Sequence, residues 1–377
     1  MSWNPDILAE FKSVFGQEAE LAVSAPGRVN LIGEHTDYNR GWVLPMAVER
    51  RIWAAAKPTT GGIELSSANM TQHVSIDKPT RRTGTWADYP IGVIWAHRGG
   101  GCNVPGVKIH YHGNVPLGGG LSSSAAIEVA TAFLLLKFCG LPLSRKQIAL
   151  TCQLAENHFV GMKCGIMDQM TSALAQSGKA LYIDCNDLNF DMVPFENDDY
   201  VIVVIDSGVK RKLAGSAYNK RRKECEEAAN KLGAKSLRDI SVEDIDKVES
   251  LPEPLNRRVR HVVTENHRVH EASGHLREGR FDEFGSLMTQ SHESLHVDFE
   301  VSIPELDFLV DSCNRIDGVL GARLTGGGFG GAIVALAKAE AVSRIEKEVV
   351  IAYREIFDKE AKLMTTKPAE GVRVEYS

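Results

Sequence analysis

The segment Pro116-Leu-Gly-Gly-Gly-Leu-Ser-Ser-Ser-Ala-Ala126 places three glycines and three serines next to an apolar stretch that runs to Cys139. This stretch, 121–139, predicts a buried helix because it is apolar on most sides. Glycines let the backbone approach a ligand closely, and the first turn of a helix offers unpaired N–H groups to an anion. A flexible linker or a tight turn is the alternative. Glycines and hydroxyls at the start of a helix favour a phosphate-binding loop.

A second glycine-rich segment, Thr325-Gly-Gly-Gly-Phe-Gly-Gly331, contains the pattern G-x-G-x-x-G. A dinucleotide-binding loop requires a strand, then the glycines, then a helix. Here the glycines precede 332–336, an apolar run that predicts a strand. We therefore expect a loop that faces the first glycine segment across a ligand site. The chain has no G-x-x-x-x-G-K-[ST], which excludes the Walker A class of nucleotide-binding proteins.

Predicted strands and helices are mixed without strict alternation, which favours an α+β fold over a doubly wound sheet. The patterns predict strands at 21–24, 42–47, 52–56, 107–111, 181–183, 200–205, 319–324, 332–336 and 372–376. They predict helices at 86–97, 121–139, 144–160, 168–175, 218–232, 258–276, 281–295, 303–315 and 339–358. A chain of 377 residues is long enough for two domains. The segment 186–199, rich in Asn, Asp and Pro, predicts a division into 1–190 and 191–377.

The composition excludes several classes of protein. Lys and Arg number 43 against 49 Asp and Glu, and the resulting net charge of −6 argues against a surface built as a whole for nucleic acid. No apolar run approaches the roughly 18 residues of a membrane span, and the N-terminus lacks the basic start and apolar core of a signal peptide. Seven scattered cysteines without C-x-x-C predict reduced thiols in a cytoplasmic protein.

His292-Glu-Ser-Leu-His296 matches H-E-x-x-H, the zinc signature of many metalloproteases. That chemistry needs both histidines on one face in the middle of a helix and a third ligand downstream. The following segment, 297–304, has the pattern of a helix exit. We therefore expect these histidines to be structural and the chain not to be a zinc hydrolase.

The most polar cluster is Ala25-Pro-Gly-Arg-Val-Asn-Leu-Ile-Gly-Glu-His-Thr-Asp-Tyr38, which we expect to be loop-like. It places an arginine, a glutamate, a histidine and an aspartate between glycines. Such side chains suit a ligand dense in hydroxyl groups, such as a sugar, because each supplies an orienting hydrogen bond. A polar turn without a ligand is the alternative.

Taken together, these segments resemble the galactokinase family of the GHMP kinase superfamily. The residues 27–38 are similar to the galactokinase signature, and 116–126 and 324–331 are similar to the second and third superfamily motifs. Cys164-Gly-Ile-Met-Asp-Gln169 is similar to the segment that carries the family's catalytic aspartate. The H-E-x-x-H match lies where the family carries a similar S-H-x-S-L stretch.

The resemblance implies a two-domain GHMP kinase fold. Its N-terminal domain is like ribosomal protein S5 domain 2, its C-terminal domain is ferredoxin-like, and the active site lies between them. The implied activity is ATP-dependent phosphorylation of α-D-galactose at its C1 hydroxyl, giving galactose 1-phosphate and ADP, the first committed step of galactose catabolism. ATP and Mg²⁺ are the implied cofactors. A cytoplasmic monomer with small-molecule substrates, and without nucleic acid or membrane partners, is expected.

The resemblance also assigns residues. Asp168 matches the catalytic aspartate and Arg28 the arginine beside it. The implied sugar-binding residues are Glu34, His35, Thr36, Asp37, Gly165 and Tyr218. The implied ATP-binding residues are Gly118, Gly119, Gly120, Leu121, Ser122, Ser123 and Ser124 of the phosphate loop, with Ser67 and Trp86 on the nucleotide side. Ser124 and Glu156 match the magnesium ligands.

Two alternatives share these motifs. One is a kinase for N-acetylgalactosamine or for a related sugar such as arabinose, which differs in the room near the sugar 2-position. The other is a catalytically silent, sugar-responsive regulator. Because Gly118–Ser124 and Asp168 are intact, activity is favoured over the silent regulator.

Overall fold

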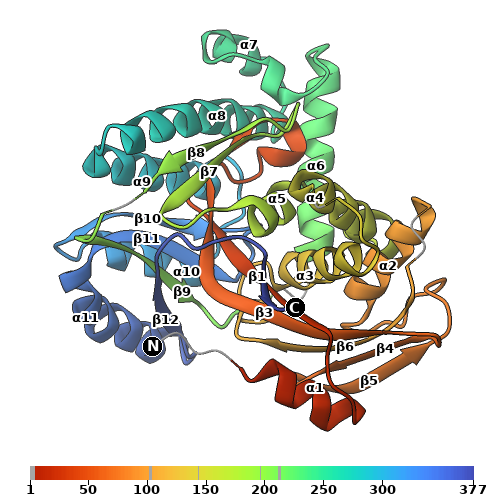
Figure 1. Ribbon diagram of the computed structural model, residues 1–377. Coiled ribbons are helices and arrows are strands. Elements are labelled where there is room, and N and C mark those ends of the chain that lie inside the picture. Colours follow the sequence, from red (N-terminus) through yellow and green to blue (C-terminus); the bar gives the residue numbers. More distant parts are fainter. Residues whose placement is uncertain (1–4, 102–103, 143, 196, 211–213) are drawn as a thin grey trace.

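The first sheet has six strands, five from residues 21–113 and one from the C-terminal end of the chain (Figure 1). The computed structural model describes residues 5–101, 104–142, 144–195, 197–210 and 214–377. The strand order is β13-β1-β3-β6-β4-β5, antiparallel except for the parallel pair β4 and β6. The strands are β1 (Leu21–Asn30), β3 (Pro45–Thr59), β4 (Ile63–Ser67), β5 (Met70–Ile76), β6 (Gly106–Gly113) and β13 (Arg373–Tyr376).

Helices cover both faces of this sheet. On β3, Ala54 and Ala56 belong to the main apolar core, whereas Trp53 and Ala55 pack with the N-terminal helix. This division follows the two-residue period of a strand, which sends successive side chains to opposite faces. The helices of this half are α1 (Ile7–Phe15), α2 (Asp88–Gly99), α3 (Ser123–Phe138), α4 (Arg145–Leu154) and α5 (Met167–Leu174), with a π-helical turn η2 (Ala155–Val160).

The second half builds a four-stranded antiparallel sheet in the order β10-β11-β9-β12. Its strands are β9 (Tyr200–Asp206), β10 (Val319–Thr325), β11 (Ala332–Lys338) and β12 (Lys362–Thr366). Its helices are α6 (Ala214–Lys231), α7 (Ile245–Val248), α8 (Leu255–Arg277), α9 (Phe281–Val297), α10 (Pro304–Asn314), α11 (Val342–Arg344) and α12 (Ile351–Phe357). A small third sheet contains β2 (Trp42–Val43), β7 (Lys179–Asp184) and β8 (Phe190–Pro194). The mixture of helices and sheets confirms the α+β class.

The last strand returns to the first sheet, where β13 pairs with β1. The buried side chain of Arg51 binds the residues that precede this strand. Its Nη1 and Nη2 atoms donate to the carbonyl oxygens of Glu370 and Gly371, both at 2.7 Å. Its Nε donates to Ser24 Oγ on β1, also at 2.7 Å. The first sheet is therefore completed by the C-terminal end of the chain.

Several predicted boundaries were wrong. The polar cluster after Ala25 was expected to be a loop, but β1 continues to Asn30 and carries Arg28. The predicted helix at 121–139 begins only at Ser123, because Ser122 is the left-handed N-cap residue. The strands β4, β5 and β12 were missed, and β8 lies inside the segment 186–199, predicted to be the least structured.

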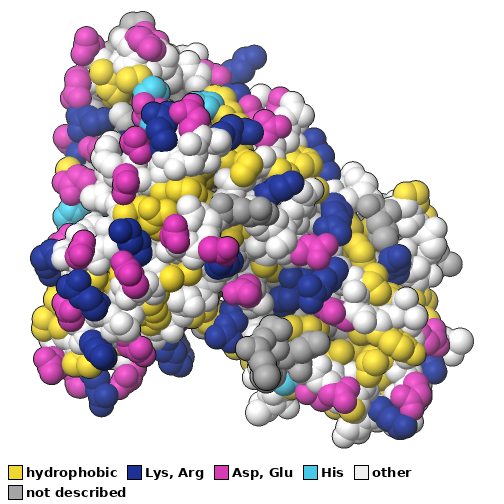
Figure 2. All heavy atoms as spheres, turned by 60° about the vertical axis from the view of Figure 1, so that its left-hand side comes forward, with side chains coloured by type: hydrophobic (Ala, Val, Ile, Leu, Met, Phe, Trp, Pro, Cys, Tyr) yellow, Lys and Arg dark blue, Asp and Glu magenta, His cyan; other side chains and the backbone are white. Residues whose placement is uncertain are grey.

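The predicted division at 190/191 falls within β8, and β13 belongs to the first sheet, so the sheets do not follow the two halves of the sequence. The position of a boundary between two domains stays a prediction. Among the described residues, no helix has the length and apolar character needed to cross a bilayer. On the face shown in Figure 2, basic and acidic side chains are interspersed.

Helix α9 packs on β10 through a contact between two glycines. A Cβ atom on Gly285 would lie 2.3 Å from the carbonyl oxygen of Leu320. A Cβ atom on Gly321 would lie 1.9 Å from the carbonyl oxygen of Gly285. Both distances are far below a van der Waals contact, so the two backbones touch directly.

We expect Gly285→Ala to lower the free energy of unfolding by about 1–3 kcal/mol, because an overpacked contact forces the backbones apart. Urea denaturation measures this change. The matched control is Gly274→Ala in α8, where an added Cβ would meet no heavy atom within 4 Å. There we expect a gain of roughly 0.5–1 kcal/mol from helix propensity. Equal stability of Gly285→Ala and wild type would contradict the close packing.

Candidate active site

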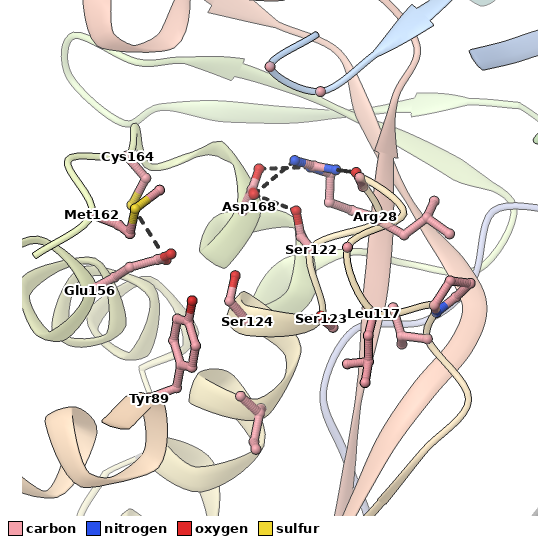
Figure 3. Close-up of a pocket in the computed structure, with 18 of the residues that line it drawn as sticks. Arg28, Tyr89, Leu117, Ser122, Ser123, Ser124, Glu156, Met162, Cys164 and Asp168 are labelled. Atoms are coloured by element: carbon pink, nitrogen blue, oxygen red, sulfur yellow. Dashed lines mark hydrogen bonds and ion pairs between the residues drawn. The ribbon is translucent and has the colours of Figure 1, made fainter. Parts of the chain in front are cut away.

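A cavity of about 800 Å³ lies where the first sheet, α3, α5 and the β10–β11 loop meet (Figure 3). It brings together side chains from segments far apart in the sequence. Of the predicted site residues, it is lined by Arg28, Glu34, His35, Asp37, Ser67, Trp86, Gly118, Gly120, Leu121, Ser122, Ser123, Ser124, Glu156, Gly165, Asp168 and Tyr218. The two glycine segments meet here as expected, since Gly326 and Gly327 also line the cavity.

The first glycine segment forms a tight loop that ends on α3. Gly118 and Gly120 have φ angles of 77° and 79°, left-handed values that favour glycine. Leu121 then accepts a hydrogen bond from the backbone N–H of Arg28 at 3.0 Å, which holds the loop against β1. The first turn of α3, with Ser123 and Ser124, lines the cavity. A helix start in this position can bind an anion through its backbone N–H groups.

Asp168 is fixed by a bidentate ion pair with Arg28. Arg28 Nε donates to Asp168 Oδ1 at 2.7 Å, and Arg28 Nη2 donates to Oδ2 at 2.8 Å. Ser122 Oγ also donates to Asp168 Oδ2, and Arg28 Nη1 donates to the carbonyl of Gly120 at 2.6 Å. Burial lowers the pKa of Arg28, but Asp168 and Glu34 outweigh it, so this pKa lies above its usual value. Arg28 thus joins the aspartate to the glycine loop.

Glu34 connects the signature segment to the second glycine segment. Its Oε1 accepts a hydrogen bond from the backbone N–H of Gly326 at 2.6 Å, and Thr325 Oγ1 lies 3.3 Å from the same oxygen. Arg323 Nη1 lies 3.6 Å from Glu34 Oε1 and donates to the carbonyl of Asn30 at 3.0 Å. Burial raises the pKa of the Glu34 carboxyl, against the opposing charge of Arg323. Sequence reasoning missed Arg323, which no motif marks as functional.

Asp37 and His35 form the polar end of the cavity with Tyr218. Burial, and then the nearby charge of Asp168, raise the pKa of Asp37 to about 7. A Cβ on Gly165 would lie 1.7 Å from Asp37 Oδ2, so only glycine fits beside this carboxylate. His35 Nδ1 lies 2.9 Å from the hydroxyl of Tyr38, and the His35 ring lies 5.5 Å from that of Tyr218.

Two predicted site residues do not reach the cavity. Thr36 is fully buried, and its hydroxyl lies 2.8 Å from the carbonyl of Gly33 and 2.7 Å from that of Trp42. Thr36 therefore stabilises the loop, and its contact with the sugar stays a prediction. Gly119 is buried and faces Asp206, whose Oδ2 would lie 2.8 Å from an added Cβ.

Glu156 lies on the cavity wall opposite the Asp168–Arg28 pair (Figure 3). Gln169 Nε2 donates to Glu156 Oε2 at 2.7 Å, and the thiol of Cys164 lies 3.5 Å from the same oxygen. Burial, and then the charge of Asp168, raise the pKa of Glu156 to about 7. Among the ion pairs of the described residues, none neutralises Glu156 with a cationic side chain.

The other end of the cavity is apolar. Its wall contains Ile52, Met70, Trp86, Tyr111 and Ile127, with Ser67 beside them. Sequence reasoning found only Trp86 and Ser67 in this group. The others come from separate strands and from α3. In such elements the sequence does not distinguish an apolar residue that lines a cavity from one that packs in the core. Lys163 and Lys210 also line the cavity and carry no motif signal.

The histidines of the H-E-x-x-H match are structural, as expected. His292 Nδ1 accepts a hydrogen bond from the backbone N–H of Leu324 at 3.3 Å, and its Nε2 lies 3.4 Å from Asp307 Oδ1. His296 Nδ1 lies 3.0 Å from Asp307 Oδ2. Within the described residues, no group of three or more His, Cys, Asp or Glu side chains is placed to hold a metal ion.

Comparison with known proteins gives three family matches. Residues 9–58 match the galactokinase galactose-binding signature. Residues 88–176 match the N-terminal domain of GHMP kinases, and 273–355 match the C-terminal domain. These matches confirm the expected two-domain GHMP kinase fold.

Individual relatives agree with these matches. The chain is 43% identical over 353 residues to the galactokinase of Thermotoga neapolitana, covering 94% of this chain and 99% of the relative. It is 42% identical over 388 residues to the human galactokinase, covering 98% of this chain and 97% of the relative. A crystal structure of Lactococcus lactis galactokinase complexed with galactose superimposes with a TM-score of 0.93 at 34% identity, covering 97% of this chain and 98% of the other.

The raised pKa of Asp37 predicts a pH-dependent stability. Because its pKa of about 7 in the folded state exceeds the unfolded value, the folded protein holds this proton more tightly. Stability is therefore lost as the pH rises from about 4 to about 7, and the full cost is present at pH 8. We expect Asp37→Asn to raise the free energy of unfolding at pH 8 by up to about 4 kcal/mol.

The gain should shrink as the pH falls from 8 to 5, which urea denaturation at each pH measures. Asp311→Asn, at an exposed position on α10, serves as the control and should change stability little at either pH. A gain for Asp37→Asn that is absent at pH 8, or that grows as the pH falls, would contradict the assignment.

Proposed function

The chain belongs to the galactokinase family, which phosphorylates galactose with ATP, and we propose that its Asp168 and Arg28 carry out the phosphoryl transfer. The observation that carries this assignment is the bidentate Asp168–Arg28 pair, placed between the glycine loop and the polar end of the cavity. A proton acceptor and a cation that can stabilise phosphate charge thus lie side by side. The high identity to galactokinases and the intact loop disfavour both an N-acetylgalactosamine kinase and a silent regulator.

In the proposed reaction, Asp168 accepts the proton of the sugar C1 hydroxyl. The C1 oxygen forms a bond to the γ-phosphorus while the bond from that phosphorus to the bridging oxygen breaks, and ADP leaves. Arg28 holds the Asp168 carboxylate in place through the bidentate pair and stabilises negative charge on the transferred group. Phosphoryl transfer depends mainly on positioning and charge stabilisation, and this pair can supply both.

We assign the ATP phosphates to the loop Gly118–Ser124 and the first turn of α3. The left-handed glycines keep the loop backbone open to a ligand, and the helix start offers N–H groups to phosphate oxygens. Within this loop the hydroxyl of Ser122 donates to Asp168, so Ser122 also connects the loop to the aspartate. The apolar end of the cavity, with Trp86 and Ser67, suits the adenine base.

We assign Mg²⁺ to Ser124 and Glu156. A buried carboxylate without a cationic partner among the described residues is the oxygen ligand that a hard divalent cation prefers. Mg²⁺ keeps several waters and binds through one or two protein groups plus phosphates, which fits a wall with few ligands. When bound, the ion would neutralise phosphate charge. Glu156 would be held for this task by the amide of Gln169.

We assign galactose to the polar end of the cavity. Glu34, His35, Asp37 and Tyr218 present hydrogen-bonding groups there. Gly165 leaves the space that Asp37 needs. The solved Lactococcus lactis relative is described as complexed with galactose, which supports this assignment.

We further propose a cytoplasmic location. In the described part of the chain, Cys152, Cys164, Cys185, Cys225 and Cys313 carry free thiols. Free thiols are typical of a reducing compartment. The monomeric state expected from the sequence stays a prediction.

A coupled ADP-release assay over a panel of acceptors tests the function. The panel contains galactose, galactosamine, N-acetylgalactosamine, arabinose, mevalonate and homoserine. We expect galactose to give the highest kcat/KM and activity to disappear when Mg²⁺ is chelated and return when Mg²⁺ is restored in excess. A better acceptor than galactose would overturn the sugar assignment, and activity in chelator would overturn the metal assignment.

We expect Asp168→Asn to lower kcat by between about a hundredfold and ten-thousandfold, the usual contribution of a positioned general base. Arg28→Ala should also lower kcat strongly, because it removes the cation next to the transferred group. Steady-state kinetics measures both, and calorimetric binding of galactose checks that each sugar site is intact. If Asp168→Asn keeps more than a tenth of the wild-type kcat, the general-base role fails.

A further inference from the structure

Helix α8, from the second half of the chain, lies against the loop that follows β1 (Figure 1). We propose that α8 sets the direction of the Glu34 side chain and thereby the affinity of the site for the sugar, with His261 and Glu265 as positioning residues. The proposal rests on the proposed sugar-binding role of Glu34 and His35. It concerns residues that do not line the cavity and that no motif marks as functional.

Glu265 holds the peptide group that precedes the Cα atom of Glu34. Its Oε1 accepts hydrogen bonds from the backbone N–H groups of Gly33 at 2.8 Å and Glu34 at 3.3 Å. The hydroxyl of Ser291 donates to the same oxygen at 2.6 Å, and Arg268 Nε donates to Oε2 at 2.8 Å. Glu265 has no exposed surface, and the neighbouring cations keep its pKa near 2 although burial opposes this. It is therefore a charged acceptor that two loop N–H groups share.

His261, one turn earlier on α8, holds the peptide group that follows the same Cα atom. Its Nε2 lies 3.1 Å from the carbonyl oxygen of Glu34, and its Nδ1 lies 2.9 Å from Ser294 Oγ. Burial lowers the pKa of His261 to about 4, so the ring is neutral near pH 7. The carbonyl oxygen of Glu34 can only accept, so Nε2 carries the proton of the ring and donates to Glu34. The two peptide groups that flank the Glu34 Cα are thus both held by one helix.

These hydrogen bonds from α8 explain how His35 keeps a left-handed backbone conformation. His35 has a φ angle of 62°, which costs a non-glycine residue roughly 1–2 kcal/mol. Such conformations persist only where the surroundings hold them. The peptide before His35 is held by His261, and the carbonyl of His35 accepts from Asn39 Nδ2 at 2.8 Å. Without the contacts to α8, part of the population would leave this conformation, and the apparent sugar affinity would fall by the lost fraction.

The test compares four variants of the full chain: His261→Leu, His261→Gln, Glu265→Gln and Glu271→Gln. His261→Leu removes the donor to Glu34, whereas His261→Gln supplies an amide N–H in its place. Glu271→Gln is the matched control, since Glu271 is exposed on the same helix and pairs with His267. Isothermal calorimetry gives the Kd values for galactose and for MgADP, and kinetics gives KM for each substrate and kcat.

We expect His261→Leu and Glu265→Gln to raise the galactose Kd and KM about tenfold, with the MgADP Kd changed less than about twofold. His261→Gln should recover most of the affinity, and Glu271→Gln should match wild type. If Glu265→Gln fails to fold, because two buried arginines lose their counterion, the His261 pair decides the outcome. Galactose Kd values within twofold of wild type for His261→Leu, or equal losses for both ligands, overturn the proposal. Absence of galactose binding by the wild type would instead overturn the sugar assignment on which it rests.

Discussion

The guanidinium of Arg323 is fully buried where the two sheets meet, and the active site is organised around this one charge. It donates to the carbonyl of Asn30 at the end of β1 and lies within 4 Å of the carboxylates of Glu34 and Glu265. A buried cation that loses its partners is strongly destabilising. Folding must therefore bring together the ends of β1 and β10 and the middle of α8. The same arrangement places the signature segment beside the second glycine loop.

The two halves of the chain contribute differently to the site. The first sheet and its helices supply the proposed reacting groups: Arg28 from β1, the glycine loop before α3, and Asp168 in the first turn of α5. The second half of the chain supplies few of the residues that line the cavity. It instead holds the backbone that carries the proposed sugar-binding groups Glu34 and His35. A site assembled from both halves requires their joint to be rigid, and a network of buried charges and hydrogen bonds provides that rigidity.

Local chemistry explains what the sequence could predict. Glycines before an apolar helix and a dense polar cluster are patterns of neighbouring residues, so the sequence marked 116–126 and 27–38, and both segments line the cavity. Glu265, His261 and Arg323 could not be found in this way. On α8 a buried glutamate and a surface glutamate look alike in the sequence, because only the tertiary fold decides which one meets the loop. The strands β4 and β5 were missed for a related reason. They lack a strong apolar pattern, and pairing sets them in place: β4 lies between β5 and β6, and β5 pairs with β4.

The return of β13 to the first sheet has a consequence for biosynthesis. Arg28 lies on β1, whose outer edge is covered by the last strand of the chain and whose approach is tied by Arg51. A nascent polypeptide that has emerged from the ribosome only as far as β12 leaves that edge of β1 open, with its backbone groups unpaired on one side. The strand that carries Arg28 thus gains its second neighbour only once residues 373–376 have been made. The first half of the chain alone leaves this sheet without one of its edge strands.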